Sequence, residues 1–267
     1  MEAHVVEKNI KNNLNSNELL ISNLVFSALK TSKQHLTRPA NPEWIEHAGQ
    51  LLFTSCLSKT FEKDRALSEL VALGFKTDTI VDHCIPVAAT LLGDGWVNDT
   101  LSFSECTIGT SNLQILLKFI GQNRERACDE TSGNRYLICS HETEQHTLGA
   151  LIIGDMLRRK GHSLKVQLST NYDEVCRLQN NSHYEAIFFS CASYLSIRET
   201  AKCVRQVKKT LKQSVPIFLG GSNIEEISQG VDLSCFDLVT NSLSAVNDYV
   251  SNKKKRELAL DAGALIQ

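Results

Sequence analysis

Residues 142–165 read ETEQHTLGALIIGDMLRRKGHSLK and span one helix with its flanks. The apolar residues of this stretch recur at helical spacing, and the run RRKG is typical of a helix end. The helix start is unusual, because Glu144, His146 and Gly149 place a carboxylate, an imidazole and a missing side chain close together. The stretch therefore predicts a buried helix, and its first turn is the part that most needs a functional explanation.

Strands and helices alternate around this stretch, from residue 135 to residue 251. Short apolar strands separated by helices imply right-handed crossovers and a parallel sheet covered on both faces. Five such units predict a flavodoxin-like or Rossmann-like sheet of five parallel strands in the order 2-1-3-4-5, which binds ligands beyond the carboxyl ends of its strands. The expected strands are 135–140, 163–168, 185–190, 215–219 and 236–240, and the later helices are 172–179, 197–212, 224–229 and 243–251.

The N-terminal half has a helical pattern instead. Apolar residues recur three and four residues apart, Pro42 suits the first turn of a helix, and Pro86 predicts a kink. We therefore expect an α/β protein in which a helical bundle cap precedes the parallel-sheet domain. The expected helices are 18–30, 43–54, 64–73, 78–92 and 103–120. The expected domains are a variable extension (1–40), a helical cap (41–126), an α/β domain (135–252) and a C-terminal tail (253–267), with a polar linker at 123–134.

The composition is typical of a soluble globular protein. Of 267 residues, 42% are hydrophobic and 22% are charged, and the formal net charge of −2 gives no reason to expect nucleic-acid binding. No stretch approaches the roughly 18 apolar residues that cross a bilayer, and the N-terminus lacks a signal-peptide core, so we expect a cytoplasmic protein. The nine cysteines form no CxxC pair and are expected to be small buried apolar residues, with a redox role for one of them left open.

The first turn of the quoted helix can form a ligand site. A carboxylate two residues before a histidine can accept the hydrogen of one ring nitrogen, which fixes the tautomer and makes the other nitrogen a better metal ligand. Each of Glu144, His146 and Gly149 also has an ordinary structural explanation by itself. A structural zinc site would need further His or Cys ligands at chelating distance, which this stretch lacks. A single imidazole suits a metal that already carries its other ligands, as in a macrocycle.

The pattern Glu144-x-His146-x-x-Gly149 resembles the Asp-x-His-x-x-Gly signature of cobalamin-binding domains. Members of that family continue with a Ser-x-Leu element and then a Gly-Gly pair. This chain has Ser190-Cys191-Ala192 and Gly220-Gly221 at matching separations, each at the end of an expected strand. The chain thus carries all three elements of the family in the family's order.

The resemblance implies a role for each of these positions. His146 would coordinate the lower face of cobalt in place of the dimethylbenzimidazole tail, and Glu144 would hold His146 by a hydrogen bond. The displaced tail would lie between the sheet and the helices, past Ser190, Ser193, Gly220 and Gly221. The implied cofactor is cobalamin, and the sequence does not select its hydroxo-, adenosyl- or methyl- form.

The chain departs from the family pattern at three places. Glu144 stands where the family usually has aspartate, which lengthens the carboxylate arm by one methylene. Ala192 stands where it has leucine, which changes one wall of the tail slot. Gly149 is followed by Ala-Leu, whereas enzyme-type corrinoid proteins commonly have Gly-Lys-Asn.

Residues 91–114, LLGDGWVNDTLSFSECTIGTSNLQ, resemble the helical cap that lies over the upper face of cobalamin in methyl carriers and light-sensing regulators. The resemblance places Trp96 on that face, where a large flat ring can shield a cobalt–carbon bond from water. Packing between helices is the alternative explanation for Trp96. Light-sensing repressors of this class carry a Glu-His pair soon after the tryptophan, whereas this chain has Glu105-Cys106.

Residues 75–245 together most resemble the AerR/PpaA group, the cobalamin-binding antirepressors of photosynthesis genes. This implies a light-responsive transcription regulator without enzymatic activity, whose partner is a repressor of the CrtJ/PpsR type. Direct DNA contact and the oligomeric state are left open, because no DNA-reading module is recognisable. Two alternatives use the same scaffold: a corrinoid methyl-carrier protein of a methyltransferase system, and a haem-binding redox or light sensor, since one histidine can serve either macrocycle.

Overall fold

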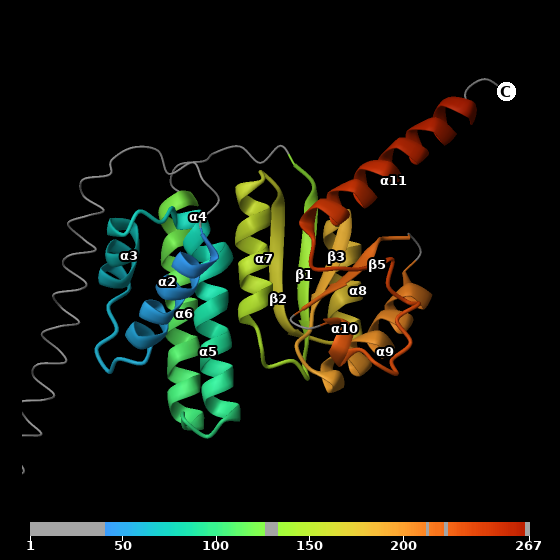
Figure 1. Ribbon diagram of the computed structural model, residues 1–267. Helices are drawn as coiled ribbons and strands as arrows, with labels where there is room; N and C mark the ends of the chain where they lie inside the picture. The colour runs from blue at the N-terminus through green and yellow to red at the C-terminus, as the bar shows by residue number, and fades with distance from the viewer. Residues whose placement is uncertain (1–40, 126–132, 212–213, 222–223, 265–267) are drawn as a thin grey trace, which may run out of the picture. The chain divides into compact units, whose positions relative to one another are not determined.

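The computed structural model describes residues 41–125, 133–211, 214–221 and 224–264 of the chain (Figure 1). These residues belong to two compact units, a helical unit that ends at Ile120 and an α/β unit that begins at Gly121. The extension predicted at 1–40, with its helix at 18–30, lies outside the described residues.

The helical unit starts as the sequence predicts. Pro42 occupies the first turn of the first described helix, and the side-chain oxygen of Asn41 accepts the Glu43 N–H at 3.2 Å. Its core is made by apolar side chains such as Ala48, Leu52, Ile85, Leu113 and Leu116. Its elements are α2 (Pro42–Cys56), α3 (Lys63–Ala72), α4 (Thr77–Thr79), a π-helical turn (Ile80–Cys84), α5 (Ile85–Val97) and α6 (Phe103–Glu125), the last of which continues past the boundary of the unit.

Two predicted helices differ from the structure. The single kinked helix expected at 78–92 is instead α4, the π-helical turn and α5. Pro86 explains the break, because it donates no N–H and its ring crowds the preceding turn, which the wider π-helical turn accommodates. The helix expected to end near Gly121 runs to Glu125, since glycine costs a helix interior only about 1 kcal/mol and does not end it.

The α/β unit contains five parallel strands in the order β2-β1-β3-β4-β5, which confirms the predicted fold class and strand order. The strands are β1 (Arg135–His141), β2 (Ser163–Thr170), β3 (Ala186–Ser190), β4 (Ile217–Gly220) and β5 (Leu238–Val239). The helices are α7 (Leu148–Arg159), α8 (Tyr172–Ser182), α9 (Tyr194–Thr210), α10 (Ile224–Ile227) and α11 (Leu243–Ala264). The last helix passes through most of the segment expected to be a separate tail.

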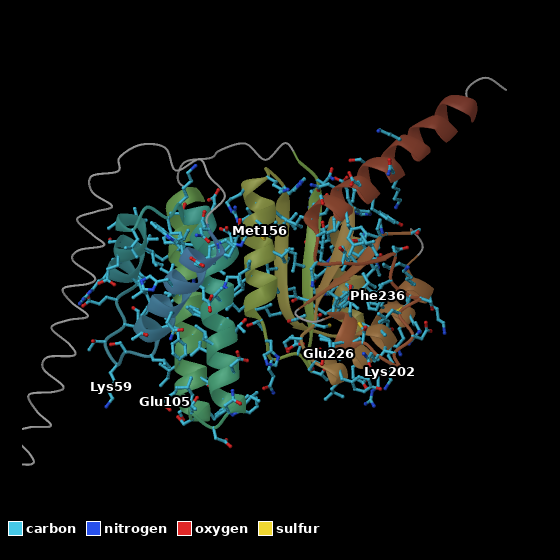
Figure 2. The ribbon with its side chains drawn as sticks, viewed as in Figure 1. Lys59, Glu105, Met156, Lys202, Glu226 and Phe236 are labelled. Carbon is cyan, nitrogen blue, oxygen red and sulfur yellow. The ribbon has the colours of Figure 1, made fainter. Side chains whose placement is uncertain are left out.

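The sheet has a core on each face. Alternate side chains of β1 point to opposite sides, so that Leu137 packs with residues of α8 and α9 and Ile138 with residues of α7 and α11. Figure 1 shows α7 on one side of the sheet and α8 and α9 on the other. Phe236 belongs to the first core, whereas Lys202 and Glu226 are exposed on helices of the same unit (Figure 2). Both faces are therefore covered, and ligand sites are expected at the strand ends. None of the described helices is both long and apolar enough to cross a membrane.

The cysteines of the described residues behave mostly as small apolar residues. None of these eight forms a disulfide, and seven are buried, while Cys106 is half-buried. Burial raises the pKa of the Cys56 thiol to about 12 and that of Cys191 to about 11, so both are uncharged at neutral pH and poor nucleophiles. The ninth, Cys128, lies outside the described residues.

Candidate cofactor-binding site

The loop between β1 and α7 carries Glu144 and His146 at the carboxyl edge of the sheet. A tight turn fixes its backbone, because the Glu144 N–H donates to the His141 carbonyl at 2.8 Å. The loop after β3 ends at the same edge, since β1 and β3 pair in parallel. Glu144 therefore meets residues that lie about fifty positions further along the chain.

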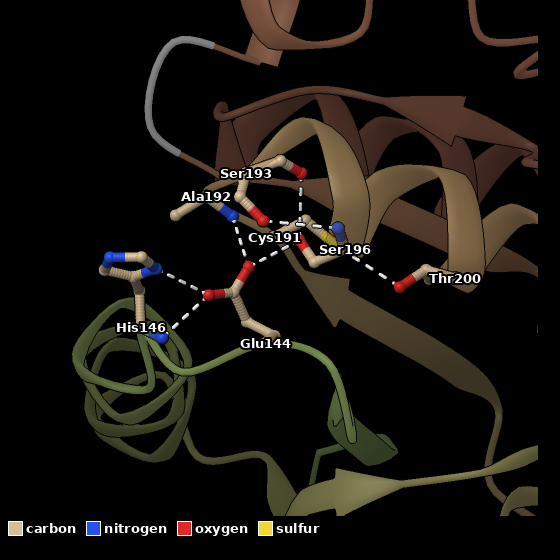
Figure 3. A network of polar contacts seen from close by, with 7 residues as sticks. All are labelled: Glu144, His146, Cys191, Ala192, Ser193, Ser196 and Thr200. Carbon is tan, nitrogen blue, oxygen red and sulfur yellow. Dashed lines mark hydrogen bonds and ion pairs between the residues drawn. The ribbon is translucent and has the colours of Figure 1, made fainter.

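The Glu144 carboxylate is the centre of a hydrogen-bond network (Figure 3). Its side chain has an exposed fraction of 0% and accepts four hydrogen bonds. Oε1 accepts from the backbone N–H and from Nδ1 of His146, both at 2.7 Å. Oε2 accepts from the Ala192 N–H at 2.7 Å and from the Ser196 hydroxyl at 2.5 Å. The carboxylate thus ties the His146 loop to the start of α9.

These bonds keep Glu144 ionised. Burial by itself would raise the pKa of Glu144, but the hydrogen bonds from His146, Ser196 and the Ala192 N–H outweigh it and lower the pKa from 4.5 to about 2. The N-terminal end of α9, to which Ser196 belongs, also favours a negative charge. An ionised carboxylate only accepts hydrogen bonds, so Nδ1 of His146 is the donor in this pair.

His146 itself faces outward. Its side chain is 65% exposed, and Figure 3 shows the second ring nitrogen, Nε2, on the side of the ring turned away from Glu144. In the neutral ring, a proton on Nδ1 leaves the lone pair on Nε2. The hydrogen bond to Glu144 raises the pKa of His146 against the opposing effect of burial. The same bond makes Nε2 a better electron donor to a metal.

Glu144→Gln is expected to destabilise the α/β unit by about 2 kcal/mol, because the amide turns an N–H₂ group toward two donors. Since the pKa of Glu144 is about 2 in the folded protein against an ordinary value of 4.5, its stabilising charge is fully effective above pH 4.5 and lost as the pH falls toward 2. In urea unfolding, the difference between wild type and Glu144→Gln should therefore shrink in acid. Glu142→Gln, at an exposed position of the same loop, should change stability by less than about 0.5 kcal/mol. A difference that stays constant with pH would contradict this role of the charge.

The structure also brings Gly149, Ser190 and Ser193 to this edge. A Cβ on Gly149, in the first turn of α7, would lie 3.3 Å from the Ser190 hydroxyl oxygen, which is a tight contact. Gly149 thus lets the start of α7 pack closely on the end of β3. Ser193 caps α9, because its hydroxyl oxygen accepts the Ser196 N–H at 3.2 Å.

Gly220 ends β4 and Gly221 follows it, at the same edge. Gly221 has a φ of +155°, and a Cβ there would overlap the Cys191 carbonyl. A Cβ on Gly220 would lie 3.0 Å from the Thr240 carbonyl oxygen, and the Gly220 carbonyl accepts the Cys191 N–H at 3.0 Å. From the sequence, the only expected reason for two adjacent glycines is to leave room for the nucleotide tail of a ligand. The structure adds a second reason, which is the contact between the backbones after β3 and β4.

No protein-family model matches the chain. A curated relative from Rhodobacter capsulatus, described as an uncharacterized 20.5 kDa protein in the bchF-crtJ intergenic region, is 30% identical over 185 residues. The match covers 68% of this chain and 96% of the relative. The chain belongs to the family of this protein. This family is called the bchF-crtJ intergenic family below.

Two solved structures are similar to this member of the bchF-crtJ intergenic family. The monomethylamine corrinoid protein of Methanosarcina barkeri is 16% identical, with a TM-score of 0.56 over 83% of this chain and 100% of that chain. A cobalamin-binding protein from Desulfitobacterium hafniense DCB-2 is 13% identical, with a TM-score of 0.38 over 79% of this chain and 97% of that chain. The likeness to the Methanosarcina barkeri protein shows that the chain has the fold of a corrinoid-binding domain preceded by helices.

Trp96 and Glu105 belong to the helical unit of this family member. Trp96, in the last turn of α5, is 50% exposed, so packing leaves half of its surface accessible. Trp96 belongs to the helical unit, whereas His146 belongs to the α/β unit. Glu105 has a local role at the start of α6 (Figure 2), where its carboxylate accepts the N–H and the hydroxyl of Ser102 at 2.8 and 2.7 Å.

Two polar residues of the α/β unit at this edge are not predicted from the sequence. Ser196 reaches Glu144 from the first turn of α9, and no motif connects positions 144 and 196. Asn241 follows β5 and binds Gly221 through its side chain. Its position directly after the strand expected at 236–240 is a signal that could have identified it, because strand ends meet at the ligand edge of such sheets.

Proposed function

We propose that this chain is a cobalamin-binding transcription regulator, a light-responsive antirepressor rather than an enzyme. The pair of Glu144 and His146 is the observation that carries the cofactor assignment. A buried, ionised carboxylate holds an exposed imidazole with its Nε2 turned outward, at the ligand edge of a fold shared with a corrinoid protein. A histidine held in this way is suited to bind a metal through Nε2.

The residues at this edge fit a corrinoid. Within the described ranges, no three His, Cys, Asp or Glu side chains are grouped so that they could hold a bare metal ion. A single imidazole can serve a metal that brings its other ligands with it. Gly149 is exposed, so the helix start that follows His146 presents no side chain to a bulky ring. The donor set and the open helix start therefore favour a macrocycle over a bare ion.

Different residues of the site would bind different parts of the cofactor. Bound cobalamin would supply a cobalt centre whose axial ligands can exchange. His146 would contribute Nε2 as the lower ligand, and Glu144 keeps the proton of the ring on Nδ1. The nucleotide tail would lie along the edge formed by Ser190, Ser193, Gly220 and Gly221. We propose Trp96 of the helical unit as the cover of the upper face.

The proposed partner is a transcriptional repressor of the CrtJ/PpsR type. The location of the Rhodobacter capsulatus relative in the bchF-crtJ intergenic region supports this partner. A ligand can change such an interaction only if the loaded and empty protein differ in affinity for the repressor. We therefore expect cobalamin to shift the affinity for the repressor, and light to act only when cobalamin is present.

A pull-down of the repressor tests the regulatory proposal. The protein is immobilised with and without cobalamin, in darkness and after illumination, and the recovered repressor is quantified. We expect recovery to differ between loaded and empty protein by about fivefold or more, the lower end of ordinary allosteric coupling. Equal recovery in all four conditions would contradict the proposal.

A corrinoid carrier for a methyltransferase is the second candidate, because the Methanosarcina barkeri protein that shares the fold is a corrinoid protein. This alternative predicts that the methylcobalamin-loaded chain gives up its methyl group to the acceptor substrate of a methyltransferase when that enzyme is present, and that repressor recovery does not depend on the cofactor. The haem-sensor alternative predicts a Soret band on titration with haem and no binding of corrinoid. An absorption spectrum of the reconstituted protein distinguishes haem from corrinoid, and the methyl-transfer and repressor measurements distinguish the two corrinoid functions.

A further inference from the structure

The Asn241 side chain forms hydrogen bonds at the ligand edge that a strand backbone would otherwise form. Its Oδ1 accepts the Gly221 N–H at 2.9 Å, and its Nδ2 donates to the Gly221 carbonyl at 2.8 Å. The paired residues of β4 and β5 end with Leu219 and Val239, and the Thr240 N–H still donates to the Leu219 carbonyl at 2.9 Å. The Asn241 side chain therefore continues the pairing of the two strands by the length of one peptide group.

This side chain fixes the glycine pair against the neighbouring loop. Gly221 is held by Asn241 on one side and lies against the Cys191 carbonyl on the other. Cys191 is followed by Ala192, whose N–H donates to Glu144, the residue that holds His146. A continuous series of contacts thus connects Asn241, through the glycine pair, with the network around the metal-binding histidine.

Asparagine fits this position fully. It carries a donor and an acceptor on one planar group, as a peptide does, and both are used here. Aspartate would keep the acceptor for the Gly221 N–H but would set a charged oxygen against the Gly221 carbonyl. Alanine would remove both bonds.

We propose that Asn241 is a positioning residue that holds the Gly220-Gly221 backbone in the shape that accepts the nucleotide tail of the corrinoid. This inference rests on the proposed cobalamin binding and adds to it a residue that acts on one part of the ligand only. Asn241 acts through the glycine pair and on the tail, whereas His146 acts on the metal.

The test compares cobalamin with cobinamide, a corrinoid that lacks the nucleotide tail. Affinities of the full-length wild type and of Asn241→Ala are measured for both compounds by absorption titration. We expect Asn241→Ala to bind cobalamin about tenfold more weakly, the factor that corresponds to one ordinary hydrogen bond, and cobinamide within about twofold of wild type. Asn241→Asp should lose cobalamin affinity to an intermediate degree, which keeps the test available if the alanine variant folds poorly.

Asn180→Ala provides the matched control, because Asn180 is exposed near the end of α8 and should leave both affinities unchanged. Unchanged cobalamin affinity in Asn241→Ala would overturn the inference, and so would an equal loss for cobalamin and cobinamide, which indicates a general structural role. If the wild type binds neither compound, the proposed function fails together with the inference. If the wild type binds cobalamin, the proposed cofactor binding stands, and the results for Asn241→Ala then test the inference alone.

Discussion

His146→Ala is expected to weaken cobalamin binding by about 100-fold or more. Substituting a residue that only hydrogen-bonds to a metal ligand already lowers metal affinity about 10- to 100-fold, and this substitution removes the ligand itself. The side chain is largely exposed, so its removal should leave the fold intact. The spectrum of any cobalamin that still binds should show the cofactor's own benzimidazole on cobalt. Absorption titration measures both the affinity and the coordination.

His47→Ala is the matched control for this prediction. His47 is an exposed histidine within α2, a helix that tolerates alanine, and it should leave affinity and spectrum unchanged. If His146→Ala bound cobalamin with the affinity and spectrum of wild type, the assignment of the ligand would be wrong. If only the affinity fell and the spectrum did not change, His146 would contact the cofactor without binding cobalt.

Gly221→Ala is expected to have the largest effect on stability, on the order of 4 kcal/mol, since it combines overpacking with a strained backbone. The new Cβ would overlap the backbone carbonyl of Cys191, which cannot move aside as a flexible side chain could. The φ of +155° is also one that alanine rarely adopts. Urea unfolding with circular dichroism measures the loss.

Gly161→Ala measures the effect of backbone strain without overpacking. Gly161 also has a positive φ, +81°, but no atom lies within 4 Å of a Cβ built there, so only the backbone strain of about 1 kcal/mol is expected. A cost for Gly221→Ala no greater than that of Gly161→Ala would show that the loops after β3 and β4 can separate. The glycine pair would then not be needed for their packing.

The sheet was predictable because its determinants are local and repetitive. Apolar strands at regular spacing, combined with right-handed crossovers, leave few possible strand orders, and the predicted order is the one observed. The last strand shows where this reasoning stops, since five residues were expected and β5 contains only Leu238 and Val239. Just before it, the Asp237 N–H donates to the Ile217 carbonyl, and the Asp237 carboxylate accepts the Ile217 N–H, both at 2.8 Å, so a side chain supplies one of the two hydrogen bonds that join the chains there. The replacement of a backbone carbonyl by a side-chain carboxylate cannot be recognised from hydrophobic periodicity.

The site was predictable to the extent that its residues are close in sequence. Glu144 and His146 are two positions apart, and their types alone indicate a hydrogen bond between them. Ser196 donates to Glu144 across 52 positions, and Asn241 binds Gly221 across 20, so both contacts depend on the sheet having formed. Gly221 was identified by the family pattern, but the carbonyl that excludes its Cβ is visible only in the fold.

Electron paramagnetic resonance of cobalt(II) cobalamin, bound to protein made with nitrogen-15 histidine, tests the cofactor assignment most directly. A single axial nitrogen splits each cobalt line into a triplet when it is nitrogen-14 and into a doublet when it is nitrogen-15. Coordination by His146 predicts a doublet in the labelled wild type that is lost in labelled His146→Ala. A triplet in the labelled wild type would show that the cofactor's own benzimidazole occupies the lower position, and would contradict the proposed role of His146.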